Sequence, residues 1–192
     1  MYLGSTTYER INRCVSEFLE DFGFTDFPFD PFLVFNVLGV TVVPYSALTP
    51  EVRALALSAS NDAFHVTGSY LDFDNLVIAY NEQMQTSRIR FSLCHELAHI
   101  ILEHTSENSG REESEADYCA GYLLVPDPVA ISNRIYSIEN IMYCFEFGYE
   151  CAKVSHDHIY NRRRCRASWK DYEYVLMSTC TVKGVSALDA SN

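Results

Sequence analysis

The sequence predicts an α+β fold in which a small sheet flanks a central helix and the C-terminal part is mostly helical. Short β-branched, alternating or apolar segments at residues 40–44, 63–68 and 76–80 are typical of strands. Two longer stretches with apolar residues at helical spacing follow, at residues 86–104 and 110–125. A cluster of strands followed by helices indicates an α+β domain.

Two helices are expected before the strands. Residues 8–22 have an amphipathic pattern that ends near Gly23. Residues 30–39 begin with Asp30 as a cap and Pro31 in the first turn, where the missing N–H of proline costs nothing. Beyond residue 128 the pattern indicates two or more short helices.

Length and composition predict one compact protein with a small appendage. The 192 residues are 48% hydrophobic and 14% aromatic, so the chain can bury a substantial core. We expect the core, with both motif helices, in residues 1–128. A small helical portion is expected in residues 129–177 and a mobile tail in residues 178–192.

Charge and cysteine content exclude several classes of protein. A net charge of −12 argues against a broad electrostatic surface for DNA or an anionic membrane. No apolar stretch approaches the roughly 18 residues of a membrane span. The seven cysteines are odd in number and irregularly spaced, and the first ten residues lack a signal-peptide pattern, so we expect a cytoplasmic protein.

An H-E-x-x-H motif occupies residues 95–99 of the first motif helix. Residues four apart project from one face of a helix, so His95 and His99 can reach one metal ion, with Glu96 beside them. Zn²⁺ lowers the pKa of a bound water to about 7, while a neighbouring carboxylate accepts its proton. The motif therefore predicts a zinc hydrolase with two histidine ligands and Glu96 as the catalytic base.

A catalytic zinc site also needs a third protein ligand, expected on the second motif helix. Glu112 forms a capping box with Ser109. The apolar residues of this helix form a stripe along one face. Glu113 lies at the edge of that stripe, whereas Glu115 points about 100° away from its centre. Periodicity therefore favours Glu113 as the third ligand and leaves Glu115 as the alternative. Asp117 lies one turn after Glu113 and could accept the second N–H of a ligand histidine, unless it simply faces solvent.

The histidines outside the motif have no partner at ligand spacing. These residues are expected at the surface or packed in the core, and they are His65, His104, His156 and His158.

The two motif helices together resemble the ImmA/IrrE family of metallo-endopeptidases. Residues 88–104 match the family's Arg-Phe approach into H-E-x-x-H. Residues 113–126 match its helix of the form E-x-(E or Q)-A-(N or D)-x-F-A-x-x-L-L-x-P, whose early glutamate completes the zinc site. The resemblance covers roughly residues 8–165 and departs at Cys119, where the family usually has Phe.

That resemblance implies a zincin-like fold of the gluzincin type, with His95, His99 and Glu113 as zinc ligands and Glu96 as the base. Family members cleave regulatory proteins, typically repressors of mobile elements or stress genes. The resemblance thus implies a zinc-dependent endopeptidase whose partner is a protein substrate such as a DNA-binding repressor, without direct contact with nucleic acid. The net acidity of the chain fits a basic partner.

Two other functions remain open from the sequence. A catalytically silent module with the zincin fold could sequester a protein partner, although such a module has no physical need for Glu96. A zinc hydrolase could also act on another carbonyl compound, because the ligands specify an activated water and not the bond that it attacks.

Overall fold

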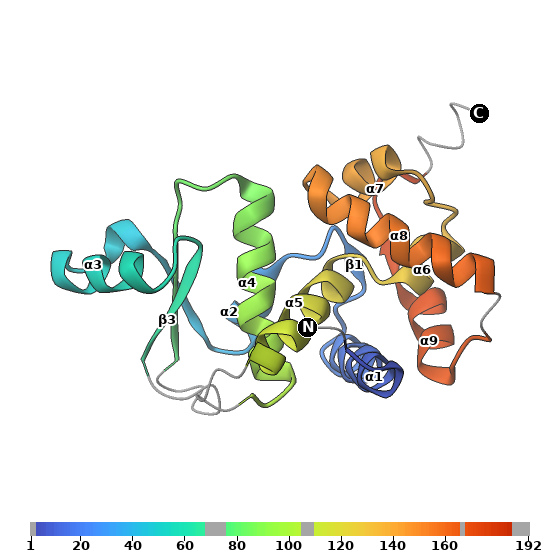
Figure 1. Ribbon diagram of the computed structural model, residues 1–192, viewed down its shortest axis with the longest axis horizontal. Helices are drawn as coiled ribbons and strands as arrows, with labels where there is room; N and C mark the ends of the chain where they lie inside the picture. The colour runs from blue at the N-terminus through green and yellow to red at the C-terminus, as the bar shows by residue number, and fades with distance from the viewer. Residues whose placement is uncertain (1–2, 68–75, 105–109, 166–167, 186–192) are drawn as a thin grey trace. The chain divides into compact units, whose positions relative to one another are not determined.

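The computed structural model describes residues 3–67, 76–104, 110–165 and 168–185 (Figure 1). It contains helices and two small sheets, so the α+β class is confirmed. The chain divides into two compact units. Unit 1 comprises residues 1–7 and 30–120, and unit 2 comprises residues 8–29 and 121–192. The boundary expected at residue 128 stays a prediction.

Unit 1 contains a three-stranded sheet at the positions that the sequence indicates. The strand order is β2 (Thr41–Pro44), β4 (Val77–Tyr80) and β3 (Ala63–Thr67). Strand β2 runs parallel to β4, and β3 runs antiparallel to it. The central strand is buried, with Ile78 and Ala79 both 0% exposed.

Helices α3 (Pro50–Ala59) and α4 (Thr86–Ile101) lie on opposite sides of this sheet (Figure 1). Helix α3 was not predicted, although Thr49 caps it by accepting a hydrogen bond from the Val52 N–H at 3.4 Å. Its buried Ala56 packs with Ala79 of the sheet. Most of its larger apolar side chains face solvent, which is why no apolar stripe marks it in the sequence.

Helix α2 (Pro31–Val37) begins as predicted. The Asp30 carboxylate accepts hydrogen bonds from the N–H groups of Phe32 and Leu33 at 3.0 and 3.4 Å. The helix ends before Gly39, whose φ of +74° is a conformation that glycine adopts without strain. Helix α2 packs against α4 and so supports it from unit 1.

Helix α4 ends at Ile101, three residues earlier than predicted. Glu103 adopts a left-handed conformation with a φ of +54°, and its N–H donates to the Ile100 carbonyl at 3.1 Å. The N–H of His104 donates to the His99 carbonyl at 3.0 Å. These two bonds form a Schellman motif, in which the chain folds back over the last helical turn. His104 therefore lies beside His99 rather than further along the helix.

Helix α5 (Gly110–Leu124) carries the second half of the motif pattern. Its first turn contains Glu112 and Glu113, whose negative charges are favourable at the positive end of the helix dipole. The capping box expected at Ser109 lies outside the described residues. Glu113, Glu115 and Asp117 all belong to the part of α5 in unit 1.

Unit 2 is mainly helical and is built from both ends of the chain. Its two-stranded sheet pairs β1 (Asp26–Phe27) in parallel with β5 (Thr181–Val182). Of the expected tail at residues 178–192, the structure describes residues 178–185, which include the end of α9 and β5. The helices of unit 2 are most of α1 (Ser5–Asp21), the end of α5, α6 (Asp127–Ser132), α7 (Ile138–Phe145), α8 (Tyr149–Cys165) and α9 (Asp171–Thr179).

Arg162 of α8 connects three helices of unit 2. Its Nη1 lies 3.2 Å from a carboxylate oxygen of Asp127 in α6, and its Nη2 lies 2.6 Å from one of Glu173 in α9. The Glu173 side chain is only 1% exposed. Burial raises the pKa of Asp127 although the charge of Arg162 opposes this effect. Arg162 thus has a structural role within the basic segment of residues 162–166.

All seven cysteines lie in the described segments, and none of them forms a disulfide. Within the same segments, every helix is too short or too polar to cross a lipid bilayer.

Candidate metal centre

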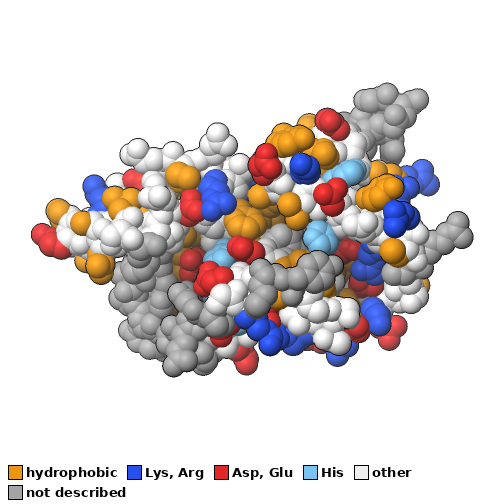
Figure 2. Space-filling model, viewed as in Figure 1, with side chains coloured by type: hydrophobic (Ala, Val, Ile, Leu, Met, Phe, Trp, Pro, Cys, Tyr) orange, Lys and Arg blue, Asp and Glu red, His pale blue; other side chains and the backbone are white. Residues whose placement is uncertain are grey.

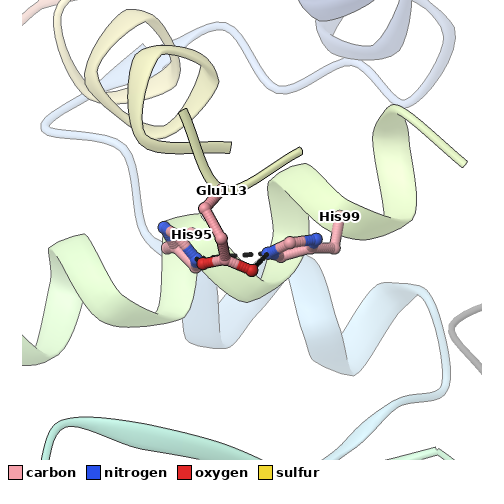
Figure 3. A group of neighbouring side chains, drawn as sticks. All are labelled: His95, His99 and Glu113. Carbon is pink, nitrogen blue, oxygen red and sulfur yellow. Dashed lines mark hydrogen bonds and ion pairs between the residues drawn. The ribbon is translucent and has the colours of Figure 1, made fainter. Parts of the chain in front are cut away.

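Three side chains converge in unit 1 with their ligand atoms facing one another. His95 and His99 come from successive turns of α4, and Glu113 reaches them from the first turn of α5 (Figure 3). The two Nε2 atoms of the histidines are 3.1 Å apart. The Glu113 carboxylate oxygens lie 3.3 Å from Nε2 of His95 and 3.8 Å from Nε2 of His99. The group matches the ligand set expected from the sequence, with Glu113 rather than Glu115 at the third position.

These separations fit a divalent metal ion. Two ligands of a tetrahedral ion with bonds of about 2.0–2.1 Å are roughly 3.3–3.4 Å apart. The three observed distances, 3.1, 3.3 and 3.8 Å, surround this value. Two imidazole nitrogens and one carboxylate are also a common ligand set of catalytic zinc, and they leave a fourth position for water or substrate. The residues present can therefore hold such an ion.

The local fold explains why the group stays together and remains accessible. The opposite side of α4 is fixed in the core of unit 1 by Leu93 and Leu97, both 0% exposed. At the site itself the side chains of His95 and Glu113 are 19% and 42% exposed. On the face drawn in Figure 2, red acidic side chains lie beside a pale blue histidine in the region of α4. Among the described residues, two of the three side chains are thus partly exposed to solvent.

Asp117 contacts the outer nitrogen of one candidate ligand. Its Oδ1 lies 3.0 Å from Nδ1 of His95, although the carboxylate is 64% exposed. The carboxylate accepts a hydrogen bond from Nδ1–H, which places the free lone pair of the ring on Nε2, facing Glu113. The contact predicted from helical spacing is present.

The surrounding carboxylates also change the proton affinity of His95. Burial lowers the pKa of the ring, but the hydrogen bond to Asp117 and the negative charges of Glu96, Asp117 and Glu113 raise it by more. The net result is a pKa above the ordinary value for histidine. The same negative potential that favours a proton here also favours a metal cation.

Glu96 lies next to the ligand group without belonging to it. The residue is buried on α4, and its ligand atoms are not among the three that converge. Burial, followed by the negative charge of Glu96, raises the pKa of Tyr45 to about 12. The Tyr45 hydroxyl donates to the Ser60 carbonyl at 3.1 Å. Glu96 is thus a carboxylate close to the candidate ligands but not one of them, as a catalytic base must be.

The sequence analysis missed the position of His104. This residue is 6% exposed, and its Nδ1 lies 3.0 Å from Nδ1 of His99. Its Nε2 lies 3.6 Å from Glu115, which in turn accepts a hydrogen bond from Nε of Arg111 at 2.8 Å. Glu115 therefore faces His104 and not the two motif histidines. The sequence signal for this arrangement would have been a helix stop after Ile101, and no glycine marks one.

Comparison with known proteins places this region in a family. The family model described as IrrE N-terminal-like domain, Peptidase_M78, matches residues 48–154, which is more than half of the chain and includes the whole ligand group. No curated protein and no solved structure matches the chain.

Proposed function

Since the chain belongs to the IrrE N-terminal-like domain family, Peptidase_M78, we propose that it is a zinc-dependent endopeptidase with a zincin-like active site in unit 1. The family is one of metallopeptidase-type domains. The observation that carries the proposal is the convergence of His95, His99 and Glu113 beside a glutamate of the same helix.

The residues of the site divide into holding and proton-transfer roles. His95, His99 and Glu113 would hold the ion. A bound Zn²⁺ supplies Lewis-acid chemistry, which polarises a carbonyl and makes water a nucleophile at neutral pH. Glu96 accepts a proton from the attacking water on its carboxylate and can return it to the leaving amine. Asp117 orients His95 through Nδ1.

The substrate that we propose is a regulatory protein, and more specifically a DNA-binding repressor. The net charge of −12 supports a basic partner of this kind. We place this reaction in the cytoplasm, because seven cysteines without a disulfide fit a reducing compartment.

The test incubates the zinc-loaded protein with candidate DNA-binding repressors from genes near its own and follows the chain length of each repressor by mass spectrometry. Glu96→Gln should keep the fold and the zinc, because Glu96 is not a ligand, yet lose at least about 10²–10⁴-fold in cleavage rate. Glu51→Gln, on an exposed position of α3, is the matched control and should cleave normally.

A different result is expected if the protein binds the repressor without cleaving it. The repressor would stay intact on mixing, and Glu96→Gln would relieve repression as well as the unaltered protein does. That combination, in a protein shown to carry zinc, would refute the peptidase and favour the binding function.

A further inference from the structure

A chain of polar contacts leads from the candidate ligand His99 to the surface of unit 1. Nδ1 of His99 lies 3.0 Å from Nδ1 of His104, and Nε2 of His104 lies 3.6 Å from Oε2 of Glu115. The other oxygen of Glu115 accepts a hydrogen bond from Nε of Arg111 at 2.8 Å. The first three side chains are buried, with exposures of 3%, 6% and 5%, whereas Arg111 is 64% exposed.

The Schellman motif at the end of α4 creates the first link. On an uninterrupted helix, residues five apart point about 140° away from each other and their side chains do not meet. The left-handed Glu103 turns the chain back, so that the rings of His99 and His104 pack with centroids 4.9 Å apart at an angle of 72°. The contact is therefore built into the backbone of this turn.

The direction of the hydrogen bond between the two rings determines whether His99 can bind a metal. His99 presents a free lone pair on Nε2 only when its proton is on Nδ1, which then donates to Nδ1 of His104. The proton of His104 must then be on Nε2, where it faces the Glu115 carboxylate. The opposite arrangement would place a lone pair of His104 against that carboxylate, and a proton on Nε2 of His99 would occupy the position that a metal ion needs between His99, His95 and Glu113.

The position of Glu115 thus favours one of the two arrangements. A buried carboxylate is stabilised by N–H groups and destabilised by a facing lone pair. Arg111 donates a hydrogen bond to the other oxygen of Glu115, and its positive charge stabilises the buried carboxylate.

We propose that His104 and Glu115 are positioning residues that hold His99 in the tautomer and orientation in which its Nε2 faces Glu113 and His95. The inference rests on the metal site of the proposed function. It also makes the two candidate histidines different from each other. The exposed Asp117 contacts His95 directly. The buried Glu115 acts on His99 only through His104, which lies between them.

The experiment measures the dissociation constant of Zn²⁺ for the full chain by competition with a coloured chelator. His104→Leu removes the Nδ1 acceptor but keeps a side chain of similar volume. It should weaken zinc binding about 10–100-fold, as is typical when a group that hydrogen-bonds a metal ligand is replaced. His104→Asn places an amide oxygen where Nδ1 was and should recover a large part of this loss. Glu115→Gln tests the next link and should also weaken binding. His156→Leu, at a partly exposed position of α8, is the matched control and should bind normally.

A second readout follows the protons directly in the zinc-loaded protein. Nitrogen-15 spectra of labelled histidine should show the proton of His99 on Nδ1 and that of His104 on Nε2. In Glu115→Gln the preference between tautomers should weaken, which a purely structural role of Glu115 would not produce. Thermal unfolding of each metal-free variant shows whether the fold is retained, and Glu115→Gln carries the test if His104→Leu does not fold.

The outcomes separate the inference from the function on which it rests. Failure of the unaltered chain to bind Zn²⁺ would overturn the proposed metal site and this inference with it. Normal zinc binding by both the unaltered chain and His104→Leu would overturn the inference and leave the proposed function standing. A proton on Nδ1 of His104 in the zinc-loaded protein would also refute the inference.

Discussion

Asp117 holds Nδ1 of His95 from one turn further along α5 than the candidate ligand Glu113, with 3.0 Å between the carboxylate oxygen and the ring nitrogen. A single helix thus supplies both a candidate ligand and the group that contacts the outer nitrogen of another candidate ligand. This arrangement ties the geometry of the site to the register of α5 against α4.

Replacing this aspartate should weaken metal binding without removing it. We expect Asp117→Asn to reduce zinc affinity about 10–100-fold, because the amide can still accept a hydrogen bond but lacks the charge of the carboxylate. The measurement is a zinc titration in competition with a chelator. Asp157→Asn is a close control, because Asp157 is also 64% exposed and also contacts a histidine ring, but in unit 2. Equal affinities for the two variants would exclude the orienting role.

Replacing the third ligand should have a larger effect than any change outside the ligand set. Glu113→Gln removes the negative charge that faces both Nε2 atoms, so we expect a loss of zinc affinity beyond that of Asp117→Asn. Glu112→Gln, in the same turn of α5, is the control and should bind nearly normally. Retention of full zinc by Glu113→Gln would show that the ligand set is wrong.

Zinc binding should fall as the pH decreases through the raised pKa of His95. Metal ions bind the neutral ring, so a proton on His95 competes with the metal. Because the pKa of His95 is raised, this competition begins at a higher pH than for a histidine with an ordinary pKa of about 6.5. In Asp117→Asn, the onset should move to lower pH. Zinc titrations at a series of pH values test both statements, and an unchanged onset in the variant would contradict the second.

In the metal-free protein, His95 should contribute more to the free energy of unfolding as the pH decreases, whereas its affinity for zinc falls. A histidine whose pKa is higher in the folded than in the unfolded chain stabilises the fold below its unfolded pKa, and this contribution is lost as the pH rises through the folded value. His95→Gln should therefore remove a stabilising contribution that grows toward low pH. Urea unfolding of both metal-free proteins at pH 5 and pH 8 measures it.

Arg162 should be essential for the stability of unit 2. Arg162→Ala leaves Glu173, which is 1% exposed, and the largely buried Asp127 without their shared cation. Breaking a buried ion pair in this way costs about 3–5 kcal/mol in the free energy of unfolding. Arg162→Lys restores a positive charge and should recover part of the loss. The recovery should be incomplete, because an ammonium cannot span two carboxylates as a planar guanidinium does. Arg164→Ala, two residues later and exposed, is the control in urea denaturation. A loss below about 1 kcal/mol for Arg162→Ala would contradict this role.

Elements with strong local signals could be predicted from the sequence. Asp30 and Pro31 determine the start of α2, and the apolar spacing around the H-E-x-x-H motif determines α4. The i,i+4 spacing within α4, together with the edge position of Glu113 on α5, indicated three side chains that converge in the structure. Each of these signals acts within a few residues, where side-chain spacing and capping are decisive.

The remaining features depend on conformations or contacts that spacing does not encode. Glycine is the usual residue at a left-handed helix end, so Glu103 gave no sign that α4 stops early. The position of His104 beside His99 was hidden for the same reason. Helix α3 did carry signals in Thr49 and Pro50, but its exposed leucines lack the pattern of a buried face.

The pairing of β1 with β5 also sets an order of events during synthesis. Residues of β1 leave the ribosome early, but their partners at Thr181–Val182 are added about 70 residues after Glu113, which corresponds to roughly 4–14 s at about 5–20 residues per second. All three candidate ligands are therefore on the growing chain while β1 still lacks its neighbour. Unit 1 can therefore assemble its candidate metal centre before unit 2 has all of its strands.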